Sequence, residues 1–75
     1  MYEKKQWYEI RIEGLVTLDW SSYFENVTTQ YTEGQTILTG ELPDQTALHG
    51  VLMRIRDLGL SLTEVKRIEN PNHPQ

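Results

Sequence analysis

Few side chains in this sequence stand in a pattern that supports catalysis. His49 has no carboxylate at a spacing that would orient it as a general base, and the second histidine, His73, lies in a polar tail. Because a metal site requires several ligands, the sequence predicts neither a metal ion nor another cofactor. Glu9 and Glu13 are separated by an arginine, which neutralises this carboxylate pair instead of tuning it. We therefore expect a protein that is not an enzyme.

The candidates for binding are side chains that fall outside the predicted core. Trp7 and Arg11 occupy the polar phase of an alternating strand, and Tyr23 is the aromatic residue of its segment that we expect to remain partly exposed. His49 and Arg56 lie off the apolar stripe of a predicted helix. Aromatic and arginine side chains are typical of binding hot spots, so these five residues form the candidate binding set.

Composition and charge argue against several classes of partner. The 75 residues contain seven basic and eleven acidic side chains, which gives a net charge of −4. Nucleic-acid binding is disfavoured, because Lys and Arg on phosphates supply most non-specific affinity. The chain has no cysteine and no long apolar run, so we expect a cytoplasmic protein without a membrane partner. A domain of this size buries only about 60% of its unfolded surface, which makes a homodimer plausible.

The strongest structural signal is a helix predicted at about residues 44–58. Asp44 can cap the first turn, because its carboxylate accepts from free backbone N–H groups. Gly59 can adopt the left-handed conformation that ends a helix, and Leu60 can fold back onto the last apolar turn. The predicted buried face consists of apolar residues at helical spacing: Ala47, Leu48, Val51, Leu52, Ile55 and Leu58.

Gly50 stands inside this helix, beside His49. Glycine in a helix interior costs on the order of 1 kcal/mol relative to alanine. That cost suggests the close approach of another backbone. We favour a predicted short helix as this neighbour, and a second subunit is the alternative.

The remaining pattern is mostly of strands. Residues 6–13 alternate as a half-buried strand, and residues 27–31 and 36–41 predict a hairpin in which Gly34 has a positive φ. Gly40 marks a bulge or a close packing contact. Residues 60–68 predict a last strand, whose apolar phase shifts between Leu62 and Val65 and so indicates a bulge.

A short aromatic segment lies between the first two strands. Asp19 is a candidate cap for a helix of at most two turns over residues 20–25. Such a short helix can hardly be held down without burying two aromatic side chains, and we expect Trp20 and Phe24 to be the buried ones.

The predicted order is strand, short helix, strand, strand, long helix, strand. This order is typical of an α+β, ferredoxin-like split βαββαβ sandwich, with a four-stranded antiparallel sheet and two helices on one face. Right-handed crossovers give the spatial strand order fourth, first, third, second. We assign residues 1–69 to this single domain and residues 70–75 to a disordered tail. The opposite sheet face would display Trp7, Arg11, Thr39 and Glu41.

Three segments carry a resemblance to a known family: YEIRIEG at 8–14, WSSYFE at 20–25 and DQTALHGVLMRIRDLGL at 44–60. They resemble a widespread family of small uncharacterised bacterial single-domain α/β proteins. The resemblance covers nearly the whole chain, and the third segment is its most specific part. It implies a compact domain that recurs alone and carries no known activity or cofactor.

Two functional hypotheses follow. The first is a non-enzymatic interaction module that pairs with itself, or with another protein as an accessory subunit, through its open sheet face or a strand edge. The second is a small-ligand sensor or a regulatory subunit of an enzyme, with its site at a dimer groove or beside Gln45, His49 and Arg56.

Overall fold

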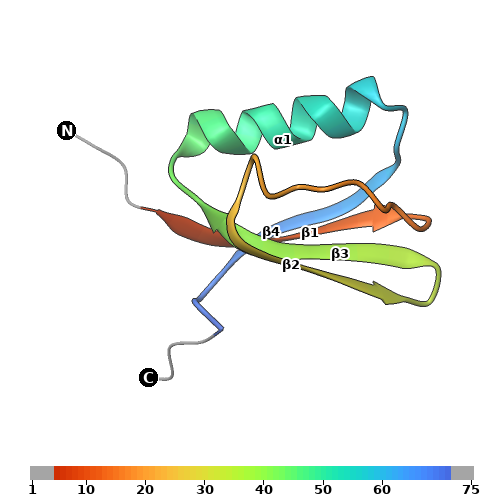
Figure 1. Ribbon diagram of the computed structural model, residues 1–75, viewed down its shortest axis with the longest axis horizontal. Helices are drawn as coiled ribbons and strands as arrows, with labels where there is room; N and C mark the ends of the chain where they lie inside the picture. The colour runs from red at the N-terminus through yellow and green to blue at the C-terminus, as the bar shows by residue number, and fades with distance from the viewer. Residues whose placement is uncertain (1–4, 72–75) are drawn as a thin grey trace.

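The computed structural model describes residues 5–71, in which four strands and one helix follow one another (Figure 1). The strands are β1 (Gln6–Glu13), β2 (Glu25–Thr32), β3 (Gln35–Leu42) and β4 (Leu62–Ile68), and the helix is α1 (Gln45–Asp57). α1 lies across one face of the sheet, and the loop of residues 14–24 runs over the same face. Among the described residues, no helix covers the opposite face, and the short segment of residues 69–71 extends from β4 on that side.

All strand pairs are antiparallel, and the spatial order is β2-β3-β1-β4. The predicted order of the four strands is therefore confirmed. β1 and β3 occupy the centre because they alternate most regularly between buried and partly exposed residues. β2 and β4 form the edges and consist mostly of exposed residues.

The prediction of a ferredoxin-like fold with two helices is wrong, because the aromatic segment forms a single turn within a loop. The Asp19 carboxylate caps this turn by accepting from the Ser21 N–H at 2.9 Å. The N–H groups of Tyr23 and Phe24 both donate to the Trp20 carbonyl, at 3.0 and 3.2 Å. A first helical turn is costly to form and needs further bonds to become favourable. Those further bonds are not made.

The turn ends because the chain enters β2 at once. Glu25 already pairs with Glu41 of β3, and Asn26 has a left-handed φ of 56° within the irregular register that follows.

The loop of residues 14–24 is also fastened to β3 by a buried threonine. The Thr36 hydroxyl donates to the Gly14 carbonyl at 2.7 Å and accepts from the Val16 N–H at 2.9 Å. These non-local bonds hold the loop in place without a second helix.

The core lies between the sheet and the layer formed by α1 and the loop. Trp20 and Phe24 are buried in it, as predicted, and they occupy the place that the short helix would have filled. Tyr23 is partly buried, also as predicted. The buried side chains of this core are Tyr8, Ile10, Ile12, Val16, Trp20, Phe24, Leu38, Leu42, Leu48, Val51 and Ile55.

Both predicted ends of α1 are confirmed. The Asp44 carboxylate accepts from the Ala47 N–H at 2.9 Å. At the other end, Gly59 has φ of 74°, and the Leu60 N–H donates to the Ile55 carbonyl at 3.1 Å. This last bond is the long-range bond of a Schellman motif. Leu58, predicted on the buried face, is instead exposed.

The turns and bulges also follow the predictions. Glu33 and Gly34 both have positive φ, 51° and 76°, which is the conformation of a two-residue type I′ hairpin turn. Thr63 is the bulged residue of β4, because Arg11 pairs with Glu64 whereas Ile12 pairs with Leu62. Of the predicted tail, residues 72–75 lie outside the described residues.

Two glycines have opposite surroundings. A Cβ atom on Gly40 would lie 2.7 Å from Phe24 Cδ2, so the predicted close packing contact is confirmed. A Cβ atom on Gly50 would have nothing within 4 Å. The favoured interpretation of Gly50, a close approach by a short helix, is therefore wrong.

Replacing Gly50 by alanine is expected to raise the free energy of unfolding by about 1 kcal/mol, because the change removes the backbone entropy cost of glycine without any clash. Urea unfolding followed by circular dichroism measures the effect. A lower stability would show that the space beside Gly50 is occupied in solution.

Candidate interaction surface

The face of the sheet opposite α1, here called the open face, is formed by alternate residues of the strands. On β1 these are the odd-numbered residues, because the even-numbered ones belong to the core. Cross-strand pairing then assigns the neighbouring residues of β3 and β4 to the same face. Its central members are Trp7, Glu9, Arg11, Ile37, Thr39, Glu41, Glu64, Lys66 and Ile68.

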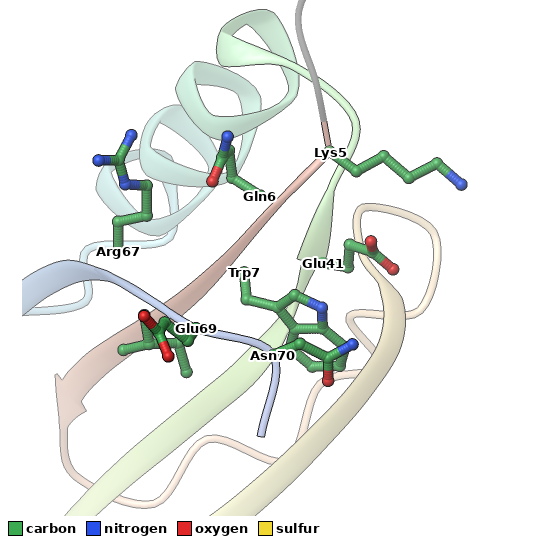
Figure 2. Close-up of a pocket in the computed structure, with 8 residues that line it drawn as sticks. Lys5, Gln6, Trp7, Glu41, Arg67, Glu69 and Asn70 are labelled. Atoms are coloured by element: carbon green, nitrogen blue, oxygen red, sulfur yellow. The ribbon is translucent and has the colours of Figure 1, made fainter. Parts of the chain in front are cut away.

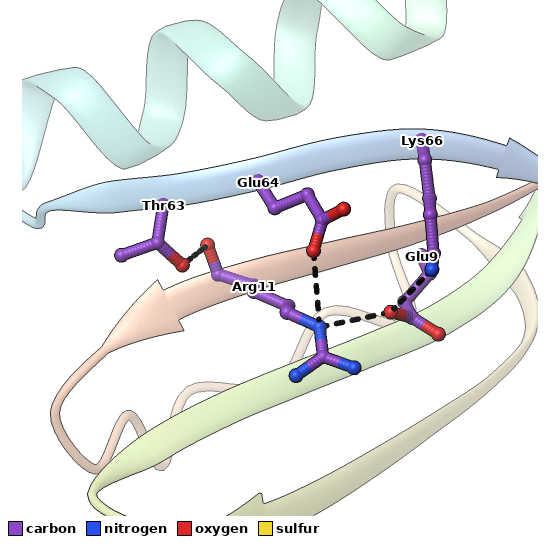
Figure 3. Close-up of polar contacts among 5 residues, drawn as sticks. All are labelled: Glu9, Arg11, Thr63, Glu64 and Lys66. Atoms are coloured by element: carbon purple, nitrogen blue, oxygen red, sulfur yellow. Dashed lines mark hydrogen bonds and ion pairs between the residues drawn. The ribbon is translucent and has the colours of Figure 1, made fainter.

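Four charged residues on β1 and β4 form a ladder across the open face (Figure 3). Arg11 Nε donates to Glu9 Oε2 at 2.9 Å and lies 3.4 Å from Glu64 Oε1. Lys66 Nζ lies 3.8 Å from Glu9 Oε2. The charged ladder of Glu9, Arg11, Glu64 and Lys66 is therefore neutral, although the whole chain carries −4. An approaching surface would meet oriented polar groups without a net charge.

Replacing Arg11 by methionine is expected to lower the free energy of unfolding by about 1 kcal/mol at low salt, because Glu9 and Glu64 would lose their shared cation. The effect should shrink in about 1 M salt, since ions screen partly exposed charges. Urea unfolding at both salt concentrations measures it. Arg56→Met is the matched control, because Arg56 is exposed and lies 3.9 Å from an equally exposed Asp57. An equal loss of unfolding free energy in both variants would contradict a stabilising role of the charged ladder.

Trp7 lies at one end of the open face. Its register is the predicted one, since it pairs with Glu41 on β3 and with Ile68 on β4, outside the main core. The expectation that this face displays Trp7 is wrong, however, because only 8% of the residue is exposed. Large neighbouring side chains surround the indole ring, so Trp7 forms the floor of a groove rather than a projecting anchor (Figure 2).

This groove has a volume of about 730 Å³. It carries charges of both signs, and the cations come from opposite sides: Figure 2 shows Lys5 at the start of β1 and Arg67 on the helix side of β4. Lys5 Nζ donates to Glu25 Oε1 at 3.0 Å, and this bond together with the Glu25 charge raises the pKa of Lys5. The groove is lined by Lys5, Gln6, Trp7, Glu41, Arg67, Ile68, Glu69 and Asn70.

Tyr23 lies on the other side of the molecule, in the loop beside α1. Its ring centroid is 5.8 Å from that of Trp20, and both rings line a hollow of about 140 Å³ near Arg54. Tyr23 is therefore separated from the open face by the sheet itself. In this hollow, the Asp19 carboxylate accepts from the Ser21 backbone N–H, and this bond lowers the pKa of Asp19.

His49 and Arg56 are both exposed on α1. They are seven residues apart, which places them on one side of the helix, two turns from each other. Gln45, the third residue of the proposed ligand site, donates from Nε2 to the Tyr8 hydroxyl at 3.0 Å and so helps to hold the start of α1 over β1. Of the five candidate binding residues, Trp7 and Arg11 lie on the open face, His49 and Arg56 lie on one side of α1, and Tyr23 lies in the loop.

Sequence reasoning missed three members of the open-face arrangement. Glu64 and Lys66 complete the charged ladder, and Ile37 is a buried apolar residue of the open face. The signal was present in the alternating signs of the two strands. It could be used only once the bulge at Thr63 had fixed which β4 residue lies beside Arg11.

Within residues 5–71, no three or more His, Cys, Asp or Glu side chains gather in a group that could hold a metal ion. In the same range, no helix has the length and apolar character needed to cross a lipid bilayer.

Comparison with protein families identifies a family for this chain. The model of a family described as a domain of unknown function, DUF8691, matches residues 7–66. The chain belongs to this family. The match begins one residue inside β1 and includes β2, β3, α1 and most of β4, so the four ladder residues of this chain lie within the matched segment. No curated protein and no solved structure matches the chain.

Proposed function

We propose that this member of the family is a small interaction module without catalytic activity, which pairs with a second copy or serves as an accessory subunit of another protein. The observation that carries the proposal is the open face. An antiparallel sheet can keep one face in water, and this face carries a neutral charged ladder beside the partly exposed Ile68, over the nearly buried side chains of Trp7 and Ile37. Such a mixture suits contact with another protein.

The environment of the titratable groups supports a role other than catalysis. His49, the one histidine among residues 5–71, is exposed on α1, and no carboxylate of the described chain bonds to it. The carboxylates of the ladder, Glu9 and Glu64, are each paired with a cation, as in a surface charge network. The absence of cysteine and the resemblance to small bacterial proteins support a cytoplasmic, bacterial setting.

Two adjacent residues of β4 allow a matched test of the open face. Lys66 belongs to the ladder, whereas Arg67 pairs with Tyr8 and points to the helix side. Lys66→Glu and Arg67→Glu change the net charge equally. Tagged protein would be purified gently from its own host, and the assemblies would be compared by size exclusion with light scattering. We expect Lys66→Glu to reduce the assemblies and Arg67→Glu to preserve them. Equal behaviour of the two variants would contradict a role for the open face.

The groove around Trp7 favours one other function, a small-ligand sensor. Its cations and carboxylates could hold a zwitterionic or polar ligand over the indole ring. A thermal-shift screen of metabolites tests this function, because a ligand at 100 times its dissociation constant stabilises the folded state by about 2.7 kcal/mol. A shift that disappears in Arg67→Ala would support it, and the absence of any shift would reject it.

A further inference from the structure

The free edge of β2 can accept another strand. We propose that the protein forms a two-fold symmetric dimer in which β2 pairs antiparallel with β2 of a second copy. This inference rests on the proposed function, of which it names the partner as a second copy, and it places the contact on the β2 edge rather than on the open face. The dimer would join the two sheets into one continuous sheet with both helices on the same side.

The two edges of the sheet differ in how they are protected against such pairing. β4 carries a bulge at Thr63 and the charges of Glu64, Lys66 and Arg67, which are features that discourage strand addition. Residues 26–32 of β2, NVTTQYT, contain no charge and no proline, and they are rich in residues that favour strands. β2 has an irregularity of its own, the register shift between Glu25 and Thr28, but residues 28–32 pair regularly with β3 and carry no charge. This stretch is therefore the less protected edge, and association through it stops at two copies.

The hairpin turn determines which backbone groups of β2 face outward. The two residues that flank a two-residue turn form a backbone hydrogen-bonded pair. Hydrogen-bonded and non-hydrogen-bonded pairs then alternate along the two strands. Thr32 pairs with Gln35 beside this turn, so Thr32 and Gln30 bond inward to β3. The backbone N–H and C=O groups of Thr29 and Tyr31 therefore point away from the sheet.

A two-fold axis at Thr29 allows these outward backbone groups to form hydrogen bonds with a second copy. Antiparallel pairing about this axis sets Thr29 opposite Thr29 of the second copy, where the two residues can exchange a pair of hydrogen bonds. The same register brings Tyr31 near Val27 of the second copy, next to the point where the register of β2 shifts. Aromatic and β-branched side chains form favourable cross-strand pairs. The strand is thus complementary to itself.

Tyr31 is an exposed aromatic residue of this edge, and Leu15 is an exposed apolar residue of the loop that Tyr31 contacts. Tyr31 is 50% exposed, and its hydroxyl donates to the Val16 carbonyl at 3.1 Å, which fixes the ring beside the loop. Leu15, the residue before Val16, is 69% exposed. Pairing of β2 would remove part of this apolar surface from water.

Charge also favours this edge for a second copy. Two chains of −4 each repel one another, so they approach most easily along an uncharged strand. The proposed register brings Glu25 near Glu33 of the second copy at each end of the seam. Lys5 lies 3.0 Å from Glu25 and offsets this repulsion.

The test introduces a charge at Thr29, so that two copies of one variant bring like charges to the two-fold axis and a mixture of two variants brings opposite charges there. Thr29 is exposed, so Thr29→Lys and Thr29→Glu should both fold, which circular dichroism and urea unfolding would verify. Sedimentation velocity of the purified chain over a range of concentrations gives the mass. We expect the wild-type chain to approach twice 8.8 kDa and each variant to raise the dimer dissociation constant by about tenfold or more, because like charges would meet at the axis. An equal mixture of the two variants should recover the dimer.

Thr46→Lys is the control, since Thr46 is exposed on α1, away from β2, and the variant carries the same change in charge. It should dimerise as the wild type does. A monomeric wild-type chain, a dimer that the Thr29 variants leave unchanged, or a mixture that stays monomeric would each overturn the inference. If the pure chain is monomeric but assemblies from the host depend on Lys66, the inference fails while the proposed function stands.

Discussion

Replacing Trp20 by alanine is expected to lower the free energy of unfolding by about 3–5 kcal/mol. Trp20 is 2% exposed and packs in the core although it belongs to a loop. A domain of this size has a total stability of roughly 4–11 kcal/mol, so the variant should lose a large share of it and unfold at a clearly lower urea concentration and temperature. Urea and thermal unfolding followed by circular dichroism measure the loss.

Two variants sharpen this prediction. Leu18→Ala changes a partly exposed residue of the same loop and should cost little. Trp20→Phe should cost less than Trp20→Ala, because the buried indole Nε1 has no hydrogen-bond partner among the described residues and so no bond is lost. A loss of less than about 1 kcal/mol in Trp20→Ala would show that the loop is not part of the core.

The second large effect is expected at Gly40, where even a methyl group should be costly. An added Cβ would lie 2.7 Å from Cδ2 and 3.0 Å from both Cβ and Cγ of Phe24. The near atoms include the base of that side chain, so a simple rotation of the ring does not relieve the clash. We expect Gly40→Ala to lower the free energy of unfolding by about 1–3 kcal/mol, the usual cost of overpacking.

Gly50→Ala is the matched control for this substitution. The chemical change is the same, but the added methyl group meets nothing within 4 Å. The two variants should therefore shift the urea midpoint in opposite directions, with Gly40→Ala below the wild type and Gly50→Ala above it. Equal shifts would mean that Phe24 does not pack against β3 in solution.

Local signals in the sequence predicted much of the fold. Asp44, Gly34 and Gly59 act through backbone chemistry within a few residues, and all three behave as predicted. The strand order was also predicted, from the order of the elements and the right-handed crossover rule, and it is correct although the second helix of that pattern is absent. Burial of Trp20 and Phe24 was predictable from their size in so small a core.

The second helix could not be ruled out locally, because one helical turn and a loop turn place aromatic residues in nearly the same way. The deciding interactions are non-local. Thr36 on β3 fastens the loop, and Glu25 is already paired with Glu41 where a helix would have continued. No window of the sequence contains both partners of these contacts.

The candidate interaction surface was likewise predicted only in part, because some of its features depend on non-local contacts. Alternation placed Trp7 and Arg11 on one face, as the structure does. The burial of Trp7 depends on its neighbours across two strands, Glu41 and Ile68, and these pairs require the tertiary register. The sequence therefore indicated the surface but not its groove or its charged ladder.

The most direct test of the interaction module is the mass of wild-type protein purified gently from its own host, measured by light scattering after size exclusion. Our account predicts species heavier than the 8.8 kDa chain, either a dimer or a complex with another protein. A mass of 8.8 kDa alone, retained at every concentration, would contradict both the interaction module and the dimer through β2.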